Sequence, residues 1–199
     1  MGRVTSLLPM ADGPAPERAD AARNREAILA AALHLVQTRG VDCVTMETVA
    51  AEAGVGKGTL FRRFESREGL MAAVLNESET AWQASVLSGP PPLGPGAPAY
   101  DRLLAFGHSR LATNLTHSKL IVAAGRPGAR SAAAMSFANM HVRYLLSELG
   151  VSGDLLMLAT AILAPLELVV LEQQVTHEHL PLERIEAGWD ELVRRIVQA

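Results

Sequence analysis

The sequence has a single cysteine, Cys43, and few aromatic residues, which make up 4% of the chain. One cysteine excludes an intrachain disulfide framework and every metal site that needs several thiolates, and it is typical of a reducing compartment. β-Branched runs are also scarce, whereas alanine and leucine are abundant, and this composition favours packed helices over sheets. The sequence therefore predicts an all-α, cytoplasmic protein.

Net positive charge is missing as well, because the 199 residues carry a formal charge of −3. The chain thus lacks the overall basicity of many nucleic-acid binders. Positive charge is instead concentrated in residues 54–67, which contain Lys57, Arg62, Arg63 and Arg67. Any nucleic-acid binding is therefore expected to reside in this segment.

Long uninterrupted apolar runs are absent too. Residues 1–18 are polar and punctuated by proline and glycine, so we expect a disordered tail and no secretion signal. The most apolar stretch, 155–171, is shorter than the roughly 20 residues that cross a bilayer, and Pro165 and Glu167 interrupt it. A helix buried within a protein is the preferred interpretation, with no membrane partner.

Helical periodicity divides the chain into two parts. Apolar residues recur at helical spacing up to Gly40, which is expected to end the first helix. Thr45 is suited to cap a second short helix, and a third begins near Lys57. We therefore predict a three-helix domain over 19–66 and a larger helical domain over 67–199.

The larger domain is expected to contain one long loop and several helices. Residues 88–98 consist mostly of proline and glycine, which predicts the loop. The last two helices carry extensive apolar faces, so we expect them to form half of a four-helix homodimer interface. The helices are predicted over 99–115, 117–124, 129–149, 155–174 and 182–197.

The first domain meets the steric demands of a helix-turn-helix. Ala50 is small enough for two helices to approach closely, and Gly54 tolerates the positive φ of a tight turn. Gly58 leaves clearance on the outer face of the helix that begins near Lys57, and the N-terminal amides of this helix suit phosphate binding. The inner faces are expected to be formed by Val49, Ala53, Val55 and Leu60.

The segment 45–70, which reads TMETVAAEAGVGKGTLFRRFESREGL, resembles the DNA-binding signature of the TetR (tetracycline repressor) family. The resemblance covers roughly residues 23–77. It implies a three-helix DNA-binding domain, a variable helical domain that dimerises and binds a ligand, and repression relieved by that ligand. By position, it places DNA contacts at Thr45, Lys57, Thr59, Phe61, Arg62, Arg63 and Arg67.

The sequence departs from the family pattern at four of its positions. Phe61 replaces a common tyrosine, which loses a phosphate-contacting hydroxyl, and Gly56 replaces a common serine cap. Arg62 and Arg63 replace aromatic or histidine residues. An arginine bidentate to guanine discriminates between bases by about 1–3 kcal/mol. We favour Arg62 for this role and leave Arg63 open as the alternative.

The effector site is less well defined by the sequence. A pocket for a small molecule needs apolar bulk with a few polar groups, a mixture that occurs on two segments of the larger domain. Core packing explains most of these residues equally well, and His141 and Tyr144 are favoured because they share a helix face. The candidates are Phe106, His108, Arg110, Met135, Phe137, Met140, His141 and Tyr144.

Other functions fit less well. Residues 56–59 hint at a phosphate-binding loop, but Ala51 stands where that motif needs glycine. Alternate residues of 177–179 diverge on a helix, so no metal or cofactor is expected. No catalytic constellation supports an enzyme. The main hypothesis is a repressor that reads a near-palindromic operator, and the alternatives are an activator or a ligand-independent regulator.

Overall fold

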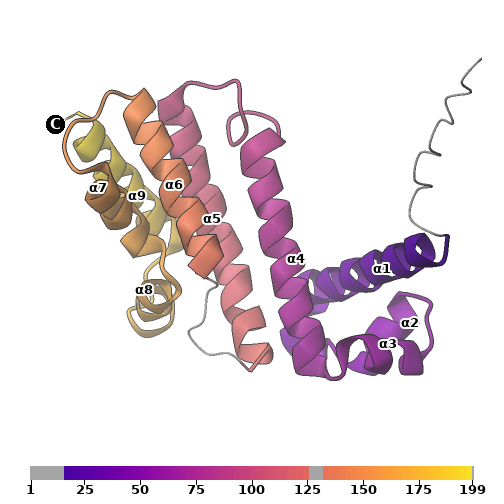
Figure 1. Cartoon of the computed structure of the whole chain (residues 1–199). Helices are drawn as coiled ribbons and strands as arrows, with labels where there is room; N and C mark the ends of the chain where they lie inside the picture. The colour runs from indigo at the N-terminus through magenta and orange to yellow at the C-terminus, as the bar shows by residue number, and fades with distance from the viewer. Residues whose placement is uncertain (1–15, 126–131, 199) are drawn as a thin grey trace, which may run out of the picture. The chain divides into compact units, whose positions relative to one another are not determined.

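The computed structural model describes residues 16–125 and 132–198, and every regular element within these ranges is helical (Figure 1). The predicted all-α class is therefore confirmed. Residues 1–15 of the tail predicted over 1–18 lie outside the described residues, whereas residues 16–18 belong to the first helix, so the prediction was wrong for these three. The chain divides into two compact units, Met1–Leu60 and Phe61–Ala199.

The first unit contains the long helix α1 (Pro16–Arg39), the 3-10 helix η1 (Val41–Cys43), α2 (Met46–Glu52) and the beginning of α3 (Lys57–Phe64). Helix α1 ends as predicted, because Gly40 adopts a φ of 81°. Helix α1 packs against both η1 and α2. Its buried side includes Ile28, Leu29, Ala32 and Leu35.

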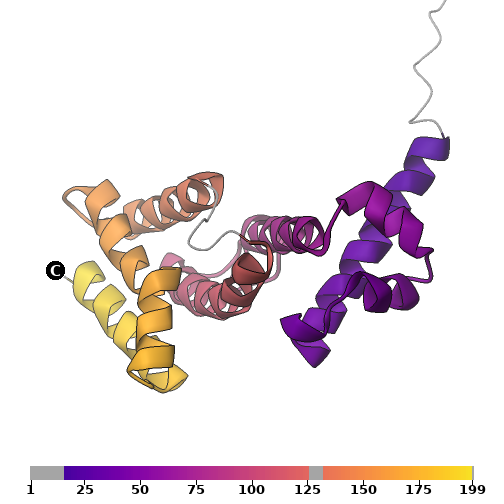
Figure 2. The same cartoon turned by 90° about the horizontal axis from the view of Figure 1, so that it is seen from below.

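The second unit is organised around α5 (Ala99–Ala123), which packs against α4 (Arg67–Ser88), α6 (Ala132–Glu148) and α9 (Leu182–Val197) (Figure 2). The loop predicted over 88–98 lies between α4 and α5. The break predicted near residue 116 does not occur. Helix α5 continues through residue 116, and the buried polar side chains on either side find partners: Asn114 donates to the Leu166 carbonyl, and His117 Nε2 lies 3.0 Å from Ser78 Oγ.

The helix predicted over 155–174 is broken. Helix α7 (Leu155–Leu163) gives way to the 3-10 helix η2 (Ala164–Leu166), then to α8 (Leu168–Glu172) and the π-helix η3 (Gln173–His177).

The break has a local cause. Pro165 has no backbone N–H, and Glu167 adopts an extended conformation with φ −68° and ψ 143°. The carbonyl of Leu166 then accepts a hydrogen bond from Asn114 Nδ2 at 2.6 Å. The stretch Leu155–His177 is long and apolar enough to cross a membrane by length and composition. Its break at Glu167 is unlike a continuous membrane-spanning helix.

Helix α9 is held against α5 and α7 by Trp189. A Cβ atom at Gly107 would lie 2.2 Å from the Trp189 ring, so only glycine allows this approach. Trp189 Nε1 donates to the carbonyl of Ile162 at 2.9 Å. His108 Nε2 lies 2.7 Å from Asp190 Oδ1, which adds a polar contact between α5 and α9.

Candidate nucleic-acid interface and effector site

The turn between α2 and α3 has the predicted geometry. Thr45 caps α2: its Oγ1 accepts from the Thr48 amide at 3.1 Å, and the Thr45 amide donates to Thr48 Oγ1 at 2.9 Å. Gly54 has a φ of 66°, a conformation that favours glycine. The Val55 amide donates to the Ala50 carbonyl at 3.0 Å and closes the turn.

Helix α3 has an inner and an outer side. Leu60 is buried, as predicted, and Phe64 is buried as well, whereas Gly58 and Arg62 are exposed. Phe61 is 43% exposed, which is high for a large aromatic side chain. A Cβ atom on Gly58 would meet nothing within 4 Å. The packing of the protein therefore does not require glycine at this position.

The cations predicted to contact DNA differ in their exposure and in whether they have partners within the protein. Arg62 makes no hydrogen bond or ion pair within the described part of the chain, whereas Arg63 and Arg67 are half-buried and have partners in the protein. Lys57 Nζ forms an ion pair with the carboxylate of Glu47 on α2. The hydrogen bond from Lys57 is the main cause that lowers the pKa of Glu47. Arg62 is therefore the most available of these cations.

The junction between α3 and α4 contains two features that the sequence did not predict, the backbone conformation of Glu65 and the close approach at Gly69. Glu65 has a positive φ of 65°, for which the sequence offers no signal. Ser66 caps α4, as its Oγ accepts from the Gly69 amide at 3.1 Å. A Cβ at Gly69 would lie 2.1 Å from the Phe64 carbonyl oxygen. Gly69 lies in the first turn of a predicted helix, where glycine is unfavourable, and this position could have indicated the close approach.

An aromatic cluster in the second unit brings together three of the predicted effector residues. We define it as Phe106, Phe137 and His141 with Trp82 of α4, which was not predicted. The Trp82 ring centroid lies 5.2 Å from that of Phe106 and 5.8 Å from that of Phe137. His141 stacks 5.2 Å from Phe106 and 6.1 Å from Phe137. Helices α4, α5 and α6 therefore meet at this cluster.

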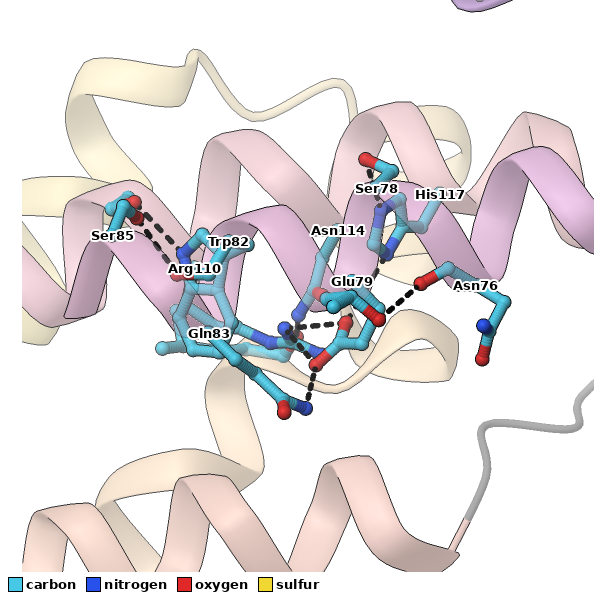
Figure 3. A network of polar contacts seen from close by, with 12 residues as sticks. Asn76, Ser78, Glu79, Trp82, Gln83, Ser85, Arg110, Asn114 and His117 are labelled. Carbon is cyan, nitrogen blue, oxygen red and sulfur yellow. Dashed lines mark hydrogen bonds and ion pairs between the residues drawn. The ribbon is translucent and has the colours of Figure 1, made fainter. Parts of the chain in front are cut away.

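Arg110 lies against the aromatic cluster and is only 1% exposed. Its Cζ is 4.3 Å from the Trp82 ring centroid, and its Nη1 donates to both oxygens of Glu79 at 2.9 and 3.1 Å (Figure 3). His117 Nδ1 lies 3.6 Å from Glu79, and His117 Nε2 lies 3.0 Å from Ser78 Oγ. Glu79 was missed, although it falls at helical spacing with Trp82 on the inner side of α4.

The remaining effector candidates lie elsewhere. Met135 is exposed, and Met140 and Tyr144 are 61% and 49% exposed. Tyr144 reaches only the edge of the cluster, with its ring centroid 6.2 Å from that of His141. His108 is engaged with Asp190 at α9. The structure therefore gathers Phe106, Phe137, His141 and Arg110 and separates the others from them.

Burial is the main cause that lowers the pKa of His141 to about 4, and the nearby charge of Arg102 adds to it. His141 is thus uncharged at neutral pH. A surface hollow of about 270 Å³ lies between α9 and the η2 and η3 segments, and another of about 550 Å³ lies between α9, α7 and the loop before α7. Neither includes a residue of the aromatic cluster. Within the described ranges, no three His, Cys, Asp or Glu side chains could together hold a metal ion.

Comparisons with known proteins agree with this geometry. A profile of the bacterial regulatory proteins of the tetR family matches residues 28–74. The multidrug binding protein EbrR, solved with imidazole, is 27% identical, with a TM-score of 0.55 over 91% of this chain and 90% of that one.

Two further structures show the same fold. Escherichia coli NemR in its reduced form is 22% identical, with a TM-score of 0.51 over 85% of this chain and 96% of that one. A TetR-like regulator from Rhodococcus sp. RHA1 is 20% identical, with a TM-score of 0.52 over 86% and 94%. No curated protein sequence matches the chain. The profile match on the helix-turn-helix and the shared helical architecture support a DNA-binding transcriptional regulator whose N-terminal domain is similar to that of the tetR family.

Proposed function

We propose that this regulator is a homodimeric repressor that a small-molecule effector releases from an inverted-repeat operator. The observation that carries the proposal is the outer side of α3, where Arg62 is exposed and unpaired within the described chain and Gly58 leaves open space. Regulators of this family are generally not enzymes, and the proposal includes no catalytic step.

In this proposal Arg62 reads a base in the major groove, because only a free guanidinium can make a bidentate contact to guanine. Arg63 is the second candidate, and its half-buried position favours a contact to the DNA backbone. Backbone contacts fix the register of the protein without reading sequence. The other proposed DNA contacts are Thr45, Lys57, Thr59, Phe61 and Arg67.

Exposed apolar side chains on the last helices support dimerisation. Val169 is 73% exposed, and it is one of several large apolar side chains that these helices leave exposed, as at a protein–protein interface. Much of the apolar face predicted on the last helix is buried within its own subunit, at Ile185, Trp189 and Val193. We therefore assign a larger share of the interface to α7 and α8. The exposed apolar residues are Leu156, Met157, Val169, Val170 and Leu182.

The aromatic cluster is the proposed effector site. It includes Trp82 on α4, and α4 begins at Arg67, only three residues after α3 ends at Phe64. An effector that prefers a different position of α4 would shift the population of DNA-binding conformers, and a coupling of about 1–3 kcal/mol changes affinity 5–150-fold. EbrR is described as a multidrug binding protein, which supports a small-molecule effector here.

Footprinting of the purified protein on DNA flanking its own gene tests the proposal. We expect a protected inverted repeat that Arg62→Ala abolishes, because each lost base contact costs about 1–3 kcal/mol. Arg143→Ala is the matched control, since Arg143 is an exposed arginine on α6.

Uniform binding to all DNA, unchanged by Arg62→Ala, would contradict sequence-specific regulation. A reporter gene under the footprinted DNA then distinguishes the two directions of control. Lower output in the presence of the protein is expected, and higher output would identify an activator.

A further inference from the structure

Arg110 uses only one of its three nitrogens in hydrogen bonds to the described residues. Nη1 donates to Glu79, whereas Nε and Nη2 are buried and have no acceptor among the described residues. Leaving a buried donor unpaired costs about 1–3 kcal/mol, and native proteins contain few such groups. Two of them on one side chain need an explanation.

The two unpaired nitrogens lie on the same edge of the guanidinium. Nε and Nη2 point their hydrogens in parallel, which is the geometry that binds both oxygens of a carboxylate. The Trp82 ring covers a face of the same group at 4.3 Å, and Glu79 holds Nη1. The orientation of the free edge is therefore fixed before any ligand arrives.

The charges around the aromatic cluster favour an anion. Arg102 of α5 reaches the edge of the same cluster, with its Cζ 5.9 Å from the ring centroid of Tyr144, and its buried Nε also has no acceptor among the described residues. Glu79 is already paired with Arg110, and no aspartate or glutamate of the described chain is fully buried. A cationic ligand would therefore meet two arginines and no free carboxylate.

The aromatic cluster determines the shape of the ligand. The ring of His141 lies at 25° to that of Phe106 and at 13° to that of Phe137, so the three rings are nearly parallel. Flat rings bind best against such surfaces in offset stacks. His141 Nε2 is buried without a partner among the described residues and offers one further hydrogen bond.

We infer that the effector is a small planar aromatic carboxylate, whose carboxylate binds the Nε and Nη2 edge of Arg110 and whose ring packs in the aromatic cluster. This inference rests on the proposed function, because it assigns the chemical class of the effector. An ordered water that satisfies Arg110 is the alternative.

Calorimetry with four probes of equal size tests the inference. Benzoate carries a carboxylate, benzamide is neutral, benzamidine is cationic, and cyclohexanecarboxylate lacks the aromatic ring. We expect benzoate to bind at least about tenfold more tightly than each of the others, since the bidentate pair and the stacked ring act together. Equal or tighter binding of benzamide or benzamidine overturns the inference, as does the absence of benzoate binding at millimolar concentration.

Variants identify the binding edge. Arg110→Lys keeps the charge beside Glu79 but removes the two-nitrogen edge, so benzoate affinity should fall about tenfold. If this variant does not fold, Arg102→Gln serves instead, because Arg102 is only half-buried. Arg102→Gln should weaken benzoate about threefold and leave benzamide unchanged. Unchanged benzoate affinity in the folded variants overturns the inference.

Operator binding, measured separately by fluorescence anisotropy, distinguishes this inference from the proposed function. Benzoate that binds without changing operator affinity would support the ligand class and contradict effector release. Release by a different molecule, with no binding of carboxylates, would overturn the ligand class and leave the repressor proposal intact.

Discussion

Helices α3 and α5 each carry a glycine and an arginine that matter to the protein, in opposite surroundings. In α3, a Cβ on Gly58 would meet nothing, and Arg62 is exposed without a partner in the described chain. In α5, a Cβ on Gly107 would collide with Trp189, and Arg110 is buried beside Glu79. The glycine and arginine of α3 are therefore open to a binding partner, whereas those of α5 are held by packing and pairing within the protein.

The comparison shows how packing separates structural from binding residues. Glycine in a helix costs about 1 kcal/mol relative to alanine, so an open glycine such as Gly58 is not explained by the fold. Gly107 is explained by the Trp189 ring alone. Arg110 belongs to both groups. Its Nη1 is explained by the bond to Glu79, whereas its Nε and Nη2 have no acceptor among the described residues.

Replacement of the two arginines should give the largest contrast. Arg110→Ala leaves the Glu79 carboxylate without its buried partner, and we expect the free energy of unfolding to fall by about 3–5 kcal/mol. Arg62→Ala should change it by less than about 0.5 kcal/mol, because the side chain is exposed. Urea denaturation followed by circular dichroism measures both. Similar losses for the two variants would contradict the comparison.

The next effect concerns pH and is specific to the α5–α6 region. Burial holds the pKa of His141 at about 4, against 6.5 for a free histidine, so the unfolded chain binds the proton first as the pH falls. The stability that depends on neutral His141 is complete above about pH 6.5 and is lost as the pH falls towards 4, by an amount on the order of 2–3 kcal/mol.

His141→Phe should therefore flatten the decline in unfolding free energy between pH 7 and pH 5. The exposed His34 provides the matched control, and His34→Phe should leave the decline in place. Parallel curves for His141→Phe and the unaltered protein would show that His141 does not titrate differently on folding.

The two glycines should respond with opposite signs. Gly107→Ala forces a methyl group into the Trp189 ring, and overpacking of this kind costs about 1–3 kcal/mol. Gly58→Ala should raise the unfolding free energy by about 0.5–1 kcal/mol, because alanine is the better helix former. Thermal unfolding of both variants measures the signs. Stabilisation by Gly107→Ala would mean that α9 moves away without cost.

Local sequence determines most of the helix-turn-helix, which explains why it could be predicted. The cap at Thr45, the positive φ at Gly54 and the buried Leu60 and Phe64 each depend on neighbours within about one or two helical turns. The exception is Glu65, whose positive φ follows from the close approach of α3 and α4 at Gly69.

The effector region depends on contacts between distant residues, and the sequence pattern does not encode them. Glu79 and Arg110 are 31 positions apart, and His108 and Asp190 are 82 apart. Periodicity groups Phe137, Met140, His141 and Tyr144 on one side of α6, but packing against α4 and α5 buries only part of that side. Met140 and Tyr144 remain exposed for this reason.

The smallest expected effect concerns Lys57, a predicted DNA-contacting cation that forms an ion pair with Glu47. Glu47 holds Lys57 in an exposed ion pair, so Glu47→Gln should release the ammonium for a phosphate and remove a negative charge near the DNA. We expect operator affinity to rise about 2–5-fold at low salt, with the gain disappearing at high salt. Fluorescence anisotropy against salt concentration measures this gain.

Glu52→Gln is the matched control, because Glu52 is an exposed carboxylate on the same helix with no ion pair in the described chain. It removes the same charge without releasing Lys57, so its gain in affinity should be smaller. If the two variants gained equally, general repulsion would account for both, and the pairing of Lys57 would not limit its contact with DNA. A larger gain for Glu47→Gln would mean that the ion pair with Glu47 limits the contact of Lys57 with DNA, whereas Arg62 has no such restraint from the described residues.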